Sequence, residues 1–274
     1  MAFEHLRAIQ PRMADELERT ALDGMMPQSV LFSGAPGSGR LTAALEEAFS
    51  LTGENEDLLS SERVAYFASR PFRPELRAAS ELFLRQRNDF SRRFFIRTVR
   101  RILLQYHSSI ASLHRESAGL KSRLDIIEGE RTVFAAASAA DELLLPIERS
   151  GEYDGNAIER TVEAISQLMT DPVLAVGKKT AGATIDEIRA IQDWLSEGSE
   201  EKAVIFENAE DYTEGAKNSL LKLLEEPPMH AHLILVSAHP GRLLETILSR
   251  VRKFTFPELT PEAVSAFIAR RFMI

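Results

Sequence analysis

The chain has 274 residues, of which 44% are hydrophobic and 27% charged, a composition typical of globular proteins that bury a large core. It contains no cysteine, so disulfide bonds and cysteine-ligated zinc are excluded. No apolar run approaches the roughly 18 residues that a membrane-spanning helix needs, and the amino-terminal sequence is no signal peptide, so we expect a cytoplasmic protein that does not enter a membrane.

The net charge of −8 is unevenly distributed along the chain. Between Arg63 and Arg123, thirteen arginines and one lysine stand against four acidic residues, which gives this stretch a charge of +10 and the rest of the chain −18. Such an asymmetry is typical of a surface that meets an anionic partner such as nucleic acid. A solvated helical hairpin with arginine-rich outer faces would give the same count, and both interpretations stay open.

The amino-terminal segment predicts the entrance to an α/β fold with three layers. Residues 3–22 have the apolar spacing of an amphipathic helix interrupted near Pro11. The sequence QSVLFSG, residues 28–34, predicts a short buried strand that ends in glycine, and residues 41–49 predict a helix. Helix, strand, loop and helix in this order are typical of the start of such a fold.

The middle of the chain has a different character. Residues 75–127 show a long helical periodicity with a wide apolar stripe, which predicts hydrophobic core more than a platform for stacking bases. Residues 128–171 are acidic and mostly helical in pattern. We therefore predict a helical insertion over about residues 53–171, between the first helix and the next strand.

The α/β pattern resumes after the insertion. Thr184 and Glu187 have the spacing of a capping box at the start of a helix over 184–198. Pro227 and Pro228 end a second helix that starts at Thr213. Because strands alternate with helices, we expect a parallel sheet. The predicted strands cover residues 172–177, 202–208, 232–240 and 252–259, and a further helix covers 242–248.

Residues 29–45, SVLFSGAPGSGRLTAAL, have the form of a phosphate-binding loop with an altered end. Such a loop directs backbone N–H groups and a helix N-terminus at phosphate oxygens. A working loop ends in Lys followed by Ser or Thr, whereas here the longer, planar Arg40 is followed by Leu41, which has no oxygen for a metal. The residues that could still bind a nucleotide phosphate are Gly34, Gly37, Ser38, Gly39 and Arg40.

The carboxyl-terminal half carries a more specific pattern. NSLLKLLEEPP, residues 218–228, is preceded by AVIFENAEDYT and followed by LILVSAHPGRLLETILSRV. This combination resembles the AAA+ clamp-loader subunits of bacterial DNA polymerase III, and most of all their delta-prime branch. The resemblance covers about residues 3–49 and 172–257. It does not cover the middle, where relatives usually carry a four-cysteine zinc module, so we expect no zinc and no other resident metal.

The resemblance implies a domain organisation. Residues 1–257 would form an AAA+ P-loop-like domain that carries the helical insertion, and residues 258–274 would begin a helical lid domain. Relatives continue into a collar domain that holds the clamp-loader ring together, and this region is absent from the chain. Assembly through a collar is therefore not expected of the chain as given.

The resemblance also implies roles for individual residues. Arg250 matches the arginine finger that reaches the γ-phosphate bound by a neighbouring subunit. Glu207 and Asn208 stand where an ATPase has an Asp-Glu pair that holds the metal shell and orients the attacking water, and Ser237 matches a sensor of the γ-phosphate. Because Glu207 is one methylene too long and Asn208 cannot accept a proton, we expect no hydrolysis at this site. Either ATP or ADP bound without hydrolysis, or no nucleotide, stays open.

The predicted function is that of a non-hydrolysing clamp-loader subunit. It would work beside a gamma/tau-like ATPase and the delta subunit, supply Arg250 to a neighbour, and help to load a sliding clamp onto primed DNA. Two alternatives stay open. The chain could be an active gamma-like P-loop ATPase that tolerates its substitutions, or an adaptor whose basic stretch, residues 63–123, binds DNA or a replication partner.

Overall fold

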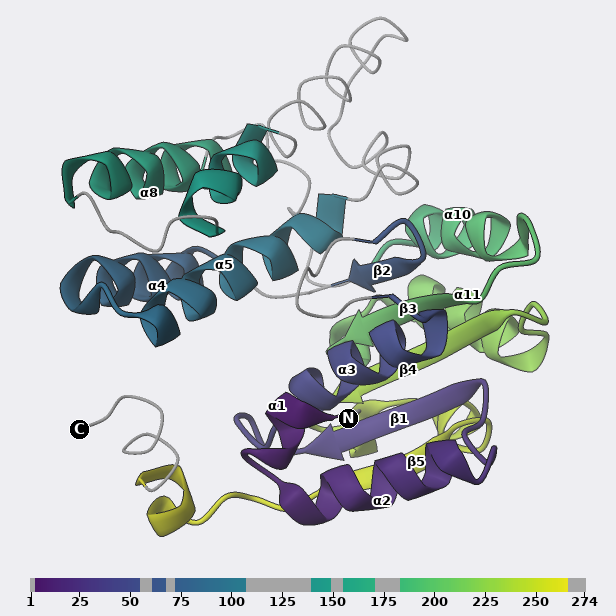
Figure 1. The fold of residues 1–274 in the computed structure, drawn as a ribbon. Helices are drawn as coiled ribbons and strands as arrows, with labels where there is room; N and C mark the ends of the chain where they lie inside the picture. The colour runs from purple at the N-terminus through teal and green to yellow at the C-terminus, as the bar shows by residue number, and fades with distance from the viewer. Residues whose placement is uncertain are drawn as a thin grey trace, which may run out of the picture. The chain divides into compact units, whose positions relative to one another are not determined.

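The computed structural model describes residues 3–54, 61–67, 72–106, 139–148, 155–170 and 183–265 (Figure 1). The chain divides into two compact units. The first comprises residues 1–56, 63–69 and 180–274, and the second comprises residues 57–62 and 70–179. The strand predicted at residues 172–177 lies outside the described residues.

The first unit is built on a five-stranded sheet in the order β2-β3-β4-β1-β5. Every neighbouring pair of strands is parallel, which confirms the predicted α/β arrangement. The four strands β1 to β4 are buried almost throughout, as expected where a parallel sheet is covered on both faces. The strands are β1 (Ser29–Gly34), β2 (Val64–Phe67), β3 (Lys202–Glu207), β4 (Ala231–Ser237) and β5 (Arg252–Phe256).

The helices of the first unit begin where local chemistry predicts them. Pro11 occupies the first turn of α2 (Pro11–Leu22), where its missing N–H costs nothing. The capping box predicted from Thr184 and Glu187 is confirmed at the start of α10 (Ile185–Ser196), where each side chain bonds the other's backbone N–H. The remaining helices are α1 (Glu4–Arg7), α3 (Arg40–Thr52), α11 (Glu214–Glu225) and α12 (Glu245–Leu248), with single 3-10 turns at Ala209–Asp211 and Pro240–Arg242.

Strand β2 differs from the prediction, because residues 64–67 lie inside the range expected to be a helical insertion. VAYF pairs with β3 along its whole length, from Val64 beside Ala203 to Phe67 beside Phe206. Four apolar residues between arginine-rich flanks are too short a run for any periodicity to show. The strand is stabilised by its pairing at the edge of the sheet, and Phe67 stacks on Phe206 with ring centroids 5.7 Å apart.

The second unit is helical in its described parts, which include α4 (Arg73–Gln86), α5 (Asp89–Leu103), residues 139–148 and α8 (Gly155–Thr170). The predicted apolar stripe supplies about half of its core, where Phe83 and Phe95 stack with centroids 5.6 Å apart, and residues 140–165 supply the rest. Between α4 and α5 the chain turns at Arg87, which has a left-handed φ of 46°, and Asn88 caps α5. The buried core residues are Leu76, Ala79, Phe83, Phe95, Ile96, Val99, Ile102, Ala140, Leu144, Ile147, Ile158, Val162 and Ile165.

Several arginines of the basic stretch pair with carboxylates inside this second unit. The Arg100 side chain is almost fully buried and lies 2.7 Å from Glu148 and 3.8 Å from Asp141. Arg101 forms an ion pair with Glu75, and Arg87 with Glu159. Arg87 and Arg100 therefore connect the basic helices to the acidic segment that follows them, and Arg101 joins α5 to α4, which gives part of the +10 charge a role in packing.

Candidate functional site

The candidate site lies at the carboxyl edge of the sheet in the first unit. Strands β3, β4 and β1 are adjacent, and their register places Glu207 beside Val236 and Ser237 beside Ser33 (Figure 1). The end of β1, which leads into the phosphate-binding loop, is two strand spacings from Glu207, about 10 Å. The edge thus brings together the loop, the Glu207–Asn208 pair and Ser237, as the sequence predicts. Open α/β sheets bind ligands at this edge.

The phosphate-binding loop keeps the backbone of its class. Gly34 is required by close packing, because a Cβ there would lie 2.6 Å from the Phe256 carbonyl oxygen. Gly39 caps α3 with a φ of 89°, in the left-handed region that favours glycine. The Ser38 hydroxyl is buried and has no hydrogen-bond partner among the described residues, so the loop retains an unsatisfied donor of the kind a phosphate oxygen can bond.

Arg40 is held by the loop itself. Its side chain is buried at the start of α3, and one guanidinium nitrogen donates a hydrogen bond to the carbonyl oxygen of Gly34. The positive charge that the sequence places at the end of the loop is therefore bound to the loop's own backbone. Leu41 follows, half-buried, with no oxygen to offer a metal ion.

The amino-terminal helices cover the loop. A Cβ on Gly39 would lie 3.1 Å from Leu6, which is fully buried at the end of α1. Gln10 donates from Nε2 to the Ser38 carbonyl at 3.3 Å and to the Pro257 carbonyl at 2.7 Å. Glu46 of α3 accepts the backbone N–H groups of His5 at 2.6 Å and Leu6 at 2.9 Å, which fixes α1 against α3.

Glu207, which the sequence predicts at the metal position, is also hydrogen-bonded within the chain. It is buried at the end of β3, and its Oε2 accepts a hydrogen bond from the Tyr66 hydroxyl of the neighbouring strand β2. Asn208 follows with a left-handed φ of 51°, and its backbone N–H donates to the Val236 carbonyl at 2.7 Å. An amide side chain at this position cannot take the proton of an attacking water.

Ser237 and Glu210 close the end of β4. The Ser237 hydroxyl is fully buried and accepts the backbone N–H of His239 at 3.1 Å. Glu210 accepts the N–H groups of Ala238 at 2.9 Å and His239 at 3.1 Å. Both side chains therefore stabilise the turn after the strand.

Tyr212 adds a second buried phenol near these carboxylates. Burial raises its pKa well above the ordinary value, and the charges of Glu187, Glu207 and Glu210 act in the same direction. The hydroxyl has no hydrogen-bond partner among the described residues. The phenol therefore stays protonated. Glu187 and Glu210 also lie near this edge, in addition to Glu207, which the sequence had predicted.

Arg250 lies elsewhere, at the amino edge of the sheet, where α12 leads into β5. One guanidinium nitrogen lies 2.7 Å from Glu225 Oε1, and another donates to the Thr246 carbonyl at 2.8 Å. Its side chain is 35% exposed, and that of Glu225 is 41% exposed. The structure thus separates this arginine from the phosphate-binding loop of its own chain.

The sequence does not predict four residues that bond the site or Arg250. Three contact the candidate site, Tyr66, Gln10 and Glu210, and the fourth, Glu225, forms the ion pair with Arg250. Each is distant in sequence from the residue it bonds, so no local motif identifies it. Glu225 alone carries a signal, because it lies inside the LLEEPP sequence that supports the resemblance.

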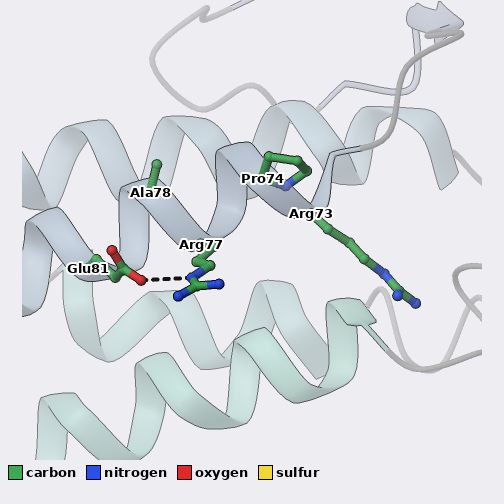
Figure 2. Close-up of a pocket in the computed structure, with 5 residues that line it drawn as sticks. All are labelled: Arg73, Pro74, Arg77, Ala78 and Glu81. Atoms are coloured by element: carbon green, nitrogen blue, oxygen red, sulfur yellow. Dashed lines mark hydrogen bonds and ion pairs between the residues drawn. The ribbon is translucent and has the colours of Figure 1, made fainter.

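A separate shallow pocket lies on the second unit, along the exposed face of α4 (Figure 2). It is lined by Arg73, Pro74, Arg77, Ala78 and Glu81. Arg77 already donates to Glu81 at 2.8 Å, four residues further along the same helix. All the lining residues come from this one helix, so the pocket adds no convergent chemistry.

Comparison with protein families identifies a match over residues 127–260 to the family described as "DNA polymerase III, delta subunit". The match includes Glu207, Asn208, Ser237 and Arg250, and it excludes the phosphate-binding loop. No group of three or more histidine, cysteine, aspartate or glutamate residues in the described ranges is arranged to hold a metal ion. No helix among the described residues is long and apolar enough to cross a membrane.

Curated proteins give the same indication over short segments. The chain is similar to the delta' subunit of DNA polymerase III from Bacillus subtilis, with 40% identity over 81 residues, which are 28% of this chain and 25% of that protein. The tau subunit from the same organism is 37% identical over 83 residues, 29% of this chain and 15% of the relative. The Escherichia coli delta' subunit is 39% identical over 79 residues, 28% and 23% respectively. The matches thus span a quarter or less of these relatives, and no solved structure matches the chain significantly.

Proposed function

We propose that this chain, a member of the clamp-loader family of DNA polymerase III, is a subunit that does not hydrolyse ATP itself. Instead, it supplies Arg250 to a nucleotide bound by its neighbour. Its five-stranded parallel sheet and glycine loop form the α/β P-loop domain of AAA+ proteins. The receiving neighbour is a gamma/tau-type ATPase subunit. The delta subunit, the sliding clamp and primed DNA are reached through the assembled complex.

The observation that carries the proposal is that both halves of the nucleotide site are held by contacts within the chain. Arg40 bonds the Gly34 carbonyl, and the Glu207 carboxylate accepts the Tyr66 hydroxyl. Phosphoryl transfer needs a cation at the phosphates, an oxygen ligand for Mg²⁺ and a residue that orients water. Leu41 and Asn208 cannot supply the last two.

In this proposal the loop would still bind a nucleotide phosphate, but without magnesium. The buried Ser38 hydroxyl has a free donor among the described residues, and the glycine backbone leaves N–H groups at the start of α3. Leu41 has no oxygen for Mg²⁺. The loop would therefore hold ATP or ADP as a structural ligand and leave it intact.

The setting of Arg250 supports its action on a partner. Its ion pair with Glu225 is partly exposed, and such pairs contribute about 0–1 kcal/mol, so phosphate can replace the carboxylate at little cost. An arginine that reaches the transferring phosphoryl group of a neighbour is worth roughly 10³- to 10⁵-fold in rate. Because Arg250 lies at the amino edge, away from the chain's own phosphate-binding loop, a role for it would have to involve another subunit.

The test is ATP hydrolysis by the complex reconstituted with a gamma/tau-type ATPase and the delta subunit. We expect Arg250→Ala to lower the turnover number at least about 100-fold for the site that receives it, with assembly unchanged. Arg242→Ala is the matched control, because Arg242 is also exposed and also forms an ion pair, with Asp211 at 3.0 Å, but lies at the carboxyl edge of the sheet, after β4. Unchanged hydrolysis in the Arg250→Ala complex would contradict the proposal.

The two alternatives make different predictions. Turnover by the purified chain that Arg40→Ala abolishes would support an active ATPase. Salt-sensitive DNA binding by the full chain that is lost when Arg73, Arg77 and Arg85 are replaced by Ala would support an adaptor. The ion pairs of Arg87, Arg100 and Arg101 with carboxylates of their own unit favour a packing role for part of the basic stretch.

A further inference from the structure

We infer that Leu22, Met25 and Met229 form, beside Arg250, an apolar docking surface for the neighbouring ATP-binding subunit. The inference rests on the proposed function, since it names the surface that would seat the partner receiving Arg250. It assigns a binding role to three residues that the arginine-finger proposal does not use.

The first observation is the exposure of these side chains. Met229 is 84% exposed, Leu22 82% and Met25 61%, whereas no other large hydrophobic side chain among the described residues exceeds 40%. Scattered exposed hydrophobic residues are ordinary, but a cluster of them marks an interaction surface. The three most exposed large hydrophobic residues of the described chain all belong to the first unit, Leu22 at the end of α2 and the two methionines on loops.

The second observation is that hydrogen bonds join these loops at the amino edge of the sheet. Gln28 immediately precedes β1, and its Nε2 donates to the carbonyls of Met229 at 2.8 Å and Pro228 at 3.0 Å. On the other side, Arg252 of β5 donates to the Met25 carbonyl at 3.2 Å. Leu22 ends α2, three residues before Met25. The loops before β1 and β4 and the start of β5 therefore lie together at one edge of the sheet (Figure 1).

This surface is continuous with Arg250. Arg250 precedes Arg252 by two residues, and its ion-pair partner Glu225 precedes Met229 by four. The carboxylate that weakly holds Arg250 thus lies on the same segment as the exposed Met229. A partner that takes the guanidinium onto its nucleotide must also approach the apolar side chains next to it. We therefore infer that the partner that binds this surface is the neighbouring ATP-binding subunit.

The residue types fit such a role. Methionine is unbranched and polarisable, so it adapts to an apolar surface that moves by small amounts between nucleotide states. Interface cores are apolar and rimmed by polar residues, and here Asp23, Glu225 and Glu226 are exposed around the methionines. The partner surface should therefore be apolar at its centre and carry basic residues at its rim, beside the bound γ-phosphate.

The experiment measures the affinity of the full chain for the gamma/tau-type ATPase subunit with ATP present, by titration followed with fluorescence anisotropy. We expect the double substitution Met25→Asp and Met229→Asp to raise Kd at least about tenfold, because charges replace side chains that the complex buries. The control is Met25→Leu with Met229→Leu, which keeps the apolar area and should leave Kd within about twofold. Ile185→Asp, on another exposed hydrophobic residue of the first unit, controls for added charge.

The outcomes separate this inference from the proposed function. Weak binding by the double Asp variant, with hydrolysis restored at saturating subunit concentration, supports the docking surface. An unchanged Kd for the double Asp variant overturns the docking surface. The arginine-finger proposal is then tested by the Arg250→Ala variant alone. Loss of self-association by sedimentation, without a change in Kd for the ATPase subunit, would also overturn this inference, because the surface would then seat a second copy of the chain. Thermal unfolding and circular dichroism confirm that each variant is folded.

Discussion

The nucleotide-site residues at the carboxyl edge of the sheet and the Arg250 ion pair at the amino edge are held in opposite ways. At the carboxyl edge, Arg40, Glu207 and Ser237 are buried, and each is bonded by a group of the same chain. At the amino edge, Arg250 and Glu225 are partly exposed and hold each other in a pair that solvent can reach.

This difference indicates which side chains can exchange their partner within the chain for an external ligand. A group that already satisfies a buried partner must lose that hydrogen bond before it can bind a ligand, and the loss is costly in a low-dielectric interior. An exposed ion pair is exchanged at little cost. Three substitutions test this contrast. One lies in α3, the helix that follows the phosphate-binding loop, and the other two lie at the carboxyl and amino edges.

The largest stability effect is expected at Glu47 of α3, a buried carboxyl with no hydrogen-bond partner among the described residues. Burial raises its pKa from 4.5 to about 7. Between these values the folded chain binds more protons than the unfolded chain, so the free energy of unfolding falls as pH rises. Glu47→Gln removes this cost, and it should match the wild type near pH 4.5 and exceed it by about 3 kcal/mol at pH 8.

Urea denaturation over pH 4.5 to 8 measures the difference. Glu16→Gln, on the exposed face of α2, is the matched control, since it removes a glutamate charge outside the core. A gain from Glu47→Gln that is equal at pH 4.5 and pH 8 would show that the carboxyl is not desolvated.

A smaller effect is expected from Tyr66→Phe, which removes the hydroxyl that bonds Glu207. A hydrogen bond to a charged acceptor contributes about 1.5–3 kcal/mol, so we expect the free energy of unfolding to fall by about 2 kcal/mol. Tyr212→Phe is the control, because its hydroxyl has no partner in the described part of the chain and its loss should cost nothing. ATP hydrolysis gained by Tyr66→Phe would contradict the view that this edge lacks catalytic groups.

The smallest effect is expected from Glu225→Ala at the amino edge. The free energy of unfolding should change by less than about 1 kcal/mol, and the reconstituted complex should keep its ATPase rate, because the pair with Arg250 is solvent-exposed. Glu226→Ala, the next exposed glutamate, is the control. A rate loss as large as that of Arg250→Ala would show that Glu225 positions the arginine.

Local signals in the sequence predicted much of the first unit. The glycine spacing from Gly34 to Gly39, the capping box of Thr184 and the paired prolines after Glu226 each act over a few residues, so the corresponding loop, helix start and helix end were correctly placed. The alternation of apolar runs with helices was enough to predict parallel pairing.

The partners of the site residues could not be predicted in this way. Tyr66 reaches Glu207 from 141 residues away, and Gln10 reaches Pro257 from 247 residues away. Such pairs depend on how the sheet is assembled, and strand β2 itself gave too short a run to be recognised. The arginine-rich helices looked like a surface for an anionic partner in part because some of their carboxylate partners follow much later in the chain, as Glu148 does for Arg100.

The pairing of β1 has a consequence for how the chain folds during synthesis. This strand is sandwiched between β4 and β5, and the hydrogen bonds from Gln28 to Pro228 and from Ser33 to Phe254 span 200 and 221 residues. The ribosome synthesises the amino terminus first, so the helical unit is complete before β4 and β5 emerge. During this time the apolar strand β1 lacks both of its neighbouring strands. Closing so long a loop is slow. The nascent chain should therefore depend on chaperones until its last strand appears.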